Sequence, residues 1–337
     1  MFAAVTKFAQ IMPHLLRSIV ASMVLIVTVS GSESRTDWPE HPITIIVPFA
    51  RGGVTDLIGR LLATELTQRL GRIVSVQNRA GEVGRVALRD VAMAAPNGYT
   101  LLVTTNAALI NLVINPNLSK TAYDTLKDFA PIAYLGSTPL VIVTRPSSGI
   151  GSIADLIAKA KANPGKLSCA SVGVGSPSGI VLDLLKIRAG IDIADTTFDG
   201  NELAMSAAIT GATDVASLGL GGSINHIRSG ELKALAQTGS DRWVDLPDVP
   251  TMAEAGIPNT VVETSLMFFA PAATPDSVID RLTRLTQAIL QQRDFQVEML
   301  EAGVRLQYEG PEGLYARITR EIPMWKEVVK PAGVKKR

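Results

Sequence analysis

The chain has 337 residues, of which 47% are hydrophobic and 19% charged, enough apolar material for a sizeable core and for two lobes. Its formal net charge of +1 excludes the global basic field that attracts nucleic acids and anionic membranes. Cys169 is the single cysteine, so neither an internal disulfide nor a cysteine-based metal site is available.

The first 32 residues differ in character from everything after them. Lys7 and Arg17 precede an apolar run over residues 19–29, and small residues follow at 30–32. This order of basic, apolar and small segments is typical of a cleaved secretory signal peptide. The apolar run is shorter than the about 20 residues of a membrane span. We therefore predict a signal peptide over 1–32 and export to the periplasm, with an uncleaved anchor or a buried helix as the alternative.

Strand-like and helix-like segments alternate from residue 42 onward. Residues 43–47 form a β-branched run between two prolines, and the leucines and isoleucine of 57–70 fall on one helical face before a glycine. The same block is expected to contain a strand at 74–76, a helix around 86–94 and a strand at 99–103. Strands separated by helices imply right-handed crossovers and a mostly parallel sheet.

A second block repeats the alternation. Ser152 is expected to cap a helix at 153–161, with Asp155 at the third position. The other elements expected are strands at 140–143, 167–170 and 232–236, helices at 180–188 and around His226, a late strand at 266–270 that returns to the first lobe, and closing amphipathic helices at 277–290 and 311–329. The pattern predicts two interleaved α/β lobes.

Three glycine-containing loops, at 48–56, 78–85 and 171–177, each follow a predicted strand and precede a predicted helix. Ligands of open α/β sheets bind beyond the carboxyl ends of the strands. Glycines let the backbone approach a ligand, and helix N-termini favour anions. We therefore expect an anionic ligand at these loops.

Motifs for catalysis are missing from the same loops. None matches a dinucleotide fingerprint, a P-loop or a nucleophile elbow. Outside the predicted signal peptide only His41 and His226 occur, and each is expected in an ordinary surface or packing role. Cys169 is expected to be a small buried strand residue. The sequence therefore predicts no cofactor, no metal site and no enzyme.

Short motifs rich in proline, glycine and asparagine recur along the chain. They are Trp38-Pro39, Val47-Pro48-Phe49 with Gly52-Gly53 and Asp56, Asn78-Arg79 with Gly81, Ala95-Pro96-Asn97-Gly98, Asn163-Pro164-Gly165, Leu246-Pro247-Asp248-Val249-Pro250, and Ala270-Pro271 with Thr274-Pro275. In residue type and order they resemble the substrate-binding proteins of tripartite tricarboxylate transporters, the Bug receptor family. The resemblance covers nearly all of the chain after the predicted signal peptide.

This resemblance implies a type II periplasmic-binding-protein fold, in which two α/β lobes are joined by crossing strands with a ligand cleft between them. We place lobe 1 at 36–137 with 264–337 and lobe 2 at 138–263, with a hinge near 136–139 and 263–266. The resemblance also implies a small organic acid as ligand and the subunits of a multi-span membrane translocator as partners. The receptor is expected to be a monomer that binds no nucleic acid.

Receptors of this family hold the ligand carboxylate largely through backbone groups and ordered waters, which agrees with the expectation from the helix N-termini. The ligand-binding residues that the resemblance implies here are Phe49, Ala50, Arg51, Gly52, Gly53, Thr55, Gly81, Gly84, Arg85, Thr105, Ser171, Gly173, Gly175, Ser176, Phe198 and Asp199. Dicarboxylates, tricarboxylates, amino acids and related acids all remain open as ligands.

The chain departs from the family's usual residues at Arg51, Arg85 and Gly179, near Phe198 and Asp199, and at Cys169. Arg51 and Arg85 add cations to the first two loops, where they either donate charge-assisted hydrogen bonds to the ligand or point to solvent. Asp199 either binds a ligand amino group or accepts hydrogen bonds within its own turn. Gly179 stands where histidine is common in the family.

Two other functions remain open on the sequence alone. The receptor could deliver its ligand to a membrane signalling protein instead of a transporter. An enzyme on a similar two-lobed scaffold would need a nucleophile or an acid–base pair in the cleft. Ser176 and Asp56 are the candidates, but no partner in the sequence activates either of them.

Overall fold

The computed structural model describes residues 38–81, 84–107, 110, 124 and 126–329. The predicted signal peptide, residues 1–32, lies outside the described residues. None of the described helices combines the length and apolar character that crossing a membrane requires.

The first lobe is built on a mixed sheet. β1 pairs in parallel with β2 and β3, and β9 is antiparallel to β3 and to β4, which also pairs with β10. The strands are β1 (Ile43–Val47), β2 (Val74–Asn78), β3 (Thr100–Thr105), β4 (Phe129–Thr144), β9 (Glu263–Pro271) and β10 (Arg305–Glu309). The helices are α2 (Val54–Leu70), α3 (Arg85–Ala92), α9 (Asp276–Leu290), α10 (Arg293–Glu301) and α11 (Pro311–Val329).

The second lobe continues the sheet from the far half of β4. β7 and β8 pair antiparallel with that half, and β5 pairs in parallel with β7 and β6. The strands are β5 (Ser168–Ser171), β6 (Ala194–Thr197), β7 (Val215–Gly219) and β8 (Lys233–Gln237). The helices are the short 3₁₀ helix η3 (Pro146–Ser148), α5 (Ile153–Ala162), α6 (Pro177–Ala189), α7 (Asn201–Thr210) and α8 (Leu220–Arg228).

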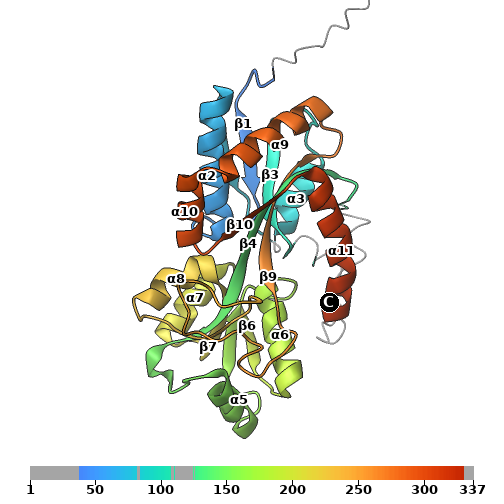
Figure 1. Cartoon of the computed structure of the whole chain (residues 1–337). Coiled ribbons are helices and arrows are strands. Elements are labelled where there is room, and N and C mark those ends of the chain that lie inside the picture. Colours follow the sequence, from blue (N-terminus) through green and yellow to red (C-terminus); the bar gives the residue numbers. More distant parts are fainter. Residues whose placement is uncertain (1–37, 82–83, 108–109, 111–123, 125, 330–337) are drawn as a thin grey trace, which may run out of the picture. The chain divides into compact units, whose positions relative to one another are not determined.

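Two strands cross between the lobes, as Figure 1 shows for β4 and β9. β4 is 16 residues long; its first part pairs with β9, and Leu140 to Val143 pair with β7. The pairing of β4 with β9 ends at Pro139 opposite Glu263. The lobe boundaries placed at 137/138 and 263/264 fall inside this crossing region and stay a prediction.

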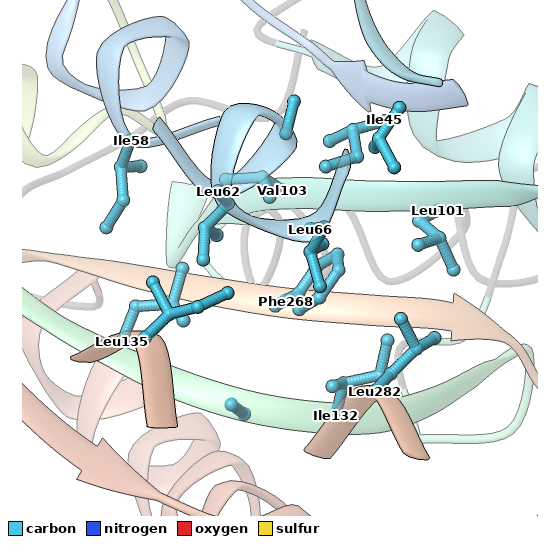
Figure 2. Packing of buried hydrophobic residues seen from close by; sticks show 14 of the residues in the cluster. Ile45, Ile58, Leu62, Leu66, Leu101, Val103, Ile132, Leu135, Phe268 and Leu282 are labelled. Carbon is cyan, nitrogen blue, oxygen red and sulfur yellow. The ribbon is translucent and has the colours of Figure 1, made fainter. Parts of the chain in front are cut away.

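The core of the first lobe explains why α2 lies where it does. Ile58, Leu62 and Leu66 are fully buried, and their spacing of four residues places them on one face of the helix. That face packs with Val103 and Phe268 of the sheet (Figure 2). Burial of one such side chain is worth about 1.5–3 kcal/mol, so the apolar stripe fixes the helix and its N-terminus against the carboxyl end of β1.

The C-terminal helix α11 packs against both lobes. Leu314 and Ile318 join the apolar cluster of Ile46 and Leu102 in the first lobe, whereas Trp325 packs in a cluster with α6. The helix occupies residues 311–329 as the sequence predicts. Its far end therefore rests on the second lobe, although the residues belong to the segment that returns to the first.

The mostly parallel sheet predicted from the alternation of elements is wrong. β9 and β10 return from late in the chain and enter antiparallel beside β3 and β4, so no helical crossover connects these neighbours. The predicted strand 140–143 is only the end of β4. Six of the described elements, η3, β6, α7, β7, α10 and β10, were not predicted; β6 is exposed at every residue, so no apolar alternation marks it.

Candidate functional site

The first loop, between β1 and α2, is fixed by hydrogen bonds to the side chains of Asn78 and Asp56. Asn78 Nδ2 donates to the carbonyl of Phe49 at 3.0 Å, and the Gly52 N–H donates to Oδ2 of Asp56 at 3.1 Å. Asp56 is the third residue of α2, where a carboxylate also complements the helix dipole. Both ends of the loop are thereby fixed relative to the helix N-terminus.

Asp56 is committed to this anchoring role. It is 5% exposed and accepts hydrogen bonds from Nε of Arg60 at 3.0 Å and from Nδ2 of Asn78 at 2.9 Å. Burial raises the pKa of the Asp56 carboxyl, but the hydrogen bonds from Arg60, Asn78 and the Gly52 N–H outweigh it and leave the pKa below its ordinary value of 3.8. The carboxylate is a fixed anion with its acceptor sites occupied, which does not suit a general base.

The third loop, between β5 and α6, is a tight turn closed by its own hydroxyls. Ser176 N–H and Oγ both donate to the carbonyl of Gly173, at 3.1 and 2.6 Å, and Gly179 N–H donates to Oγ of Ser176 at 3.1 Å, which caps α6. Gly173 has φ of 95°, a conformation that favours glycine. A Cβ on Gly179 would lie 2.4 Å from the Gly173 carbonyl oxygen, so no larger residue fits there without moving the turn.

Four helices begin at one cavity of about 350 Å³. The first turns of α2, α6, α7 and α8 all contribute lining residues, together with the ends of β3 and the crossing strands. Each helix N-terminus carries roughly half a positive charge on N–H groups without intrahelical partners. Their convergence makes the cavity favourable for a small anion. The volume falls in the usual range for small-molecule sites, about 300–1,000 Å³.

Half of the predicted site residues line this cavity. They are Phe49, Ala50, Arg51, Gly53, Thr55, Thr105, Ser176 and Asp199. Gly52, Ser171, Gly173, Gly175 and Phe198 belong to the same loops but do not line it. Ser171 is fully buried and donates from Oγ to Asp195, and the Phe198 N–H donates to the Ser171 carbonyl, so these two residues support the turn.

The second predicted loop does not line the cavity within the part of the chain that the structure describes, which lacks residues 82–83. Gly81, Gly84 and Arg85 are absent from the lining. Gly84 instead packs against the first loop, because a Cβ there would lie 2.9 Å from Cβ of Pro48. A ligand contact of Gly81, Gly84 or Arg85 therefore stays a prediction.

The sequence did not single out several lining residues. Thr138, Leu140 and Thr264 come from the crossing strands, and Asn201, Glu202 and Leu203 come from the first turn of α7. For the second group a signal was present. Glycine followed by Asn201 and Glu202, ahead of a small apolar run, is a typical helix start.

The two histidines and the cysteine considered in the sequence lie outside the cavity lining. The His41 ring lies 5.6 Å from the ring of Tyr99, and His226 Nδ1 is 2.6 Å from Glu231 Oε2. Cys169 is buried in β5, as predicted, and burial together with the nearby Asp195 raises the pKa of its thiol to about 12. Within the described residues, no three His, Cys, Asp or Glu side chains group so that they could hold a metal ion.

Two α/β lobes joined by crossing strands, with helix N-termini converging on a small cavity between them, define a solute receptor of the type II periplasmic-binding-protein class. Similarity to known proteins identifies the family within this class. The family described as "Tripartite tricarboxylate transporter family receptor" matches residues 58–334. The chain belongs to this family, which confirms the resemblance and the fold that it implied.

Three relatives illustrate the similarity. Protein BugT of Bordetella pertussis is 33% identical over 322 residues, which is 95% of this chain and 98% of that protein. The periplasmic binding protein BugD is 32% identical, with a TM-score of 0.82, over 89% of this chain and 100% of that one. The R. palustris protein Rpa4515, solved with adipate, is 29% identical, with a TM-score of 0.82, over 88% of this chain and 98% of that one.

Proposed function

We propose that this protein is an extracytoplasmic receptor that binds a small organic carboxylate in the cavity between its lobes and delivers it to a tripartite tricarboxylate-type membrane transporter. The observation that carries the proposal is the convergence of the first turns of α2, α6, α7 and α8 on one cavity of about 350 Å³. Relatives of similar length include a protein solved with adipate, a carboxylate of suitable size.

The binding mode follows from the groups that face the cavity. The N–H groups at the start of α2 and the hydroxyls of Thr55 and Thr105 can donate to a carboxylate. Arg51 is exposed and lines the cavity at its first loop, where a guanidinium can add a charge-assisted hydrogen bond. Binding is therefore proposed to rest on backbone donors and hydroxyls, with Arg51 as the cation.

A thermal-shift and calorimetric panel of dicarboxylates and tricarboxylates tests ligand class. An acid present at 100 times its dissociation constant should stabilise the protein by about 2.7 kcal/mol. Diamides of the same skeletons, such as adipamide for adipate, are matched controls that lack the charge and should give no shift. If no carboxylate stabilises the protein, or if the diamides do so equally, the proposed ligand class is wrong.

Two further measurements address export and delivery. Fractionation of expressing cells should place the protein in the periplasm with an N-terminus near residue 33. Deletion of its gene should abolish uptake of the acid identified in the panel, and restoring the gene should restore uptake. Unchanged uptake together with an altered transcriptional response to the acid would instead point to a signalling receptor.

A further inference from the structure

The cavity carries two carboxylates that have no partner among the described residues. Asp199 precedes α7 and Glu202 lies in its first turn, and both line the cavity. Both side chains are exposed, and neither takes part in any hydrogen bond or ion pair within the described part of the chain. Asp199 accepts no hydrogen bond from its own turn, whose Gly200 N–H donates to Phe198 instead.

Glu202 extends across the cleft to the opposite lobe. A Cβ built on Gly52 would lie 2.9 Å from Oε1 of Glu202, so the carboxylate on α7 rests against the backbone of the first loop. The side chain is thus placed where a solute enclosed between that loop and α7 would meet it. Arg51, the neighbouring residue, is the single cationic lining residue among those described, and it makes no ion pair with either acid.

The other helix starts at the cavity lack unpaired acids. The first turns of α6 and α8 contain no acidic residue, and Asp56 in α2 is occupied by Arg60, Asn78 and Gly52. Thr55, 5% exposed, lines the cavity and its hydroxyl has no hydrogen-bond partner among the described residues. The α2 and α6 side therefore suits an anion, and the α7 side adds two uncompensated negative charges.

We propose that the solute of this receptor carries an ammonium group as well as a carboxylate, so that it is an amino acid in the broad sense and not a plain diacid. The inference rests on the proposed function and deepens it. The carboxylate lies toward Thr55 and the α2 and α6 N-termini, and the ammonium donates to Asp199 and Glu202. A second carboxylate in that place would face like charges, whereas an ammonium forms charge-assisted hydrogen bonds.

Matched pairs of acids test the proposal by calorimetric titration of the purified protein. The pairs are succinate with 4-aminobutyrate, glutarate with 5-aminopentanoate, adipate with 6-aminohexanoate, and glutarate with L-glutamate. Within at least one pair the amine-bearing member should bind at least about tenfold more tightly, the ratio that corresponds to about 1.4 kcal/mol. Glu202→Gln and Asp199→Asn should remove most of that preference while leaving the amine-free member bound equally well or better.

Glu312→Gln is the matched control, because Glu312 is likewise an exposed acid in the second position of a helix, α11, and does not line the cavity. It should leave every affinity unchanged. Tighter binding of the amine-free member in every pair, or an equal effect of Glu202→Gln on both members of a pair, overturns the inference. The proposal of a carboxylate receptor is then unaffected. Binding of no compound in either series overturns the proposed function itself.

Discussion

Replacing Asp56 with asparagine should loosen the first loop and lower both stability and affinity for a carboxylate. The Asp56 carboxylate accepts hydrogen bonds from Arg60 at 3.0 Å, Asn78 at 2.9 Å and the Gly52 N–H at 3.1 Å. An amide has one accepting oxygen and two N–H donors, so it turns an N–H toward at least one of these donors. The hydrogen bond from the Gly52 N–H is the weakest of the three and should be lost first, which releases the loop backbone.

The size of the destabilisation depends on how far the hydrogen-bonded groups are exposed to water. Hydrogen bonds to a charged group contribute about 1.5–3 kcal/mol, but the Arg60 side chain is 40% exposed and regains water when its partner is lost. We expect a loss of about 2 kcal/mol in the free energy of unfolding. An unfolding entropy of about 2.1 cal/mol/K per residue over roughly 300 residues converts this into a fall of about 3 °C in Tm.

The pH dependence has a defined sign. Because the pKa of Asp56 lies below its ordinary value of 3.8 in the folded protein, its stabilising contribution is complete above that value and is lost as the pH falls through the folded pKa. Urea unfolding of wild type and Asp56→Asn should therefore differ by a constant amount between about pH 6 and 8, and the difference should shrink as the pH falls below 3.8 and through the folded pKa.

Asp155→Asn is the matched control for Asp56→Asn. Asp155 is also the third residue of its helix, α5, and accepts a hydrogen bond from the N–H four residues earlier, Gly151, at 2.9 Å. It is exposed and remote from the cavity, so its replacement should cost at most about 1 kcal/mol and leave ligand affinity unchanged. Equal destabilisation by the two variants, or a difference between wild type and Asp56→Asn that does not shrink as the pH falls below 3.8, refutes the reasoning.

Three further outcomes are expected. Arg51→Ala should weaken carboxylate binding about tenfold, and a titration of this variant with wild-type affinity would end the ligand role of Arg51; the same titration of Arg85→Ala, outside the cavity lining, tests the ligand contact predicted for that residue. Gly179→Ala should cost about 1–3 kcal/mol and reduce affinity, because its Cβ meets the Gly173 carbonyl at 2.4 Å; a melting curve and a titration check both. The Cys169 thiol, buried and with its pKa raised to about 12, should resist iodoacetamide until the protein is unfolded in urea, and labelling of the native protein would contradict its placement.

The elements that the sequence predicted well are those whose apolar pattern alone determines their structure. The strand at 43–47 matches β1, and the helix at 311–329 matches α11. β1 is buried along nearly its whole length between bounding prolines, and α11 has a long amphipathic period. The Ser152 cap was likewise confirmed, since its side chain accepts a hydrogen bond from the Asp155 N–H, a local interaction that neighbouring residues decide.

The candidate site was only half predictable because it is assembled from distant segments. Glycine-rich loops after strands marked the starts of α2 and α6, and these do reach the cavity. Thr138 and Thr264 reach it because β4 and β9 pair across the lobes, and no local pattern in either strand encodes that register. Glu202 was missed because α7 is rich in small residues and follows an exposed strand, so neither element shows a clear period.

The two lobes approach each other closely at glycines. A Cβ on Gly303, in the turn between α10 and β10, would lie 2.8 Å from the Cα of Gly221 at the start of α8. The Gly52 backbone meets Glu202 in a similar way. Separation of the lobes at these two approaches would widen access to the cavity between the first loop and α7. Gly136 cannot supply that motion easily, because β10 lies so near that a Cβ there would be 2.3 Å from the Arg305 carbonyl. Bending is therefore expected just beyond this pinned segment, where β4 leaves β9 and continues into the second lobe.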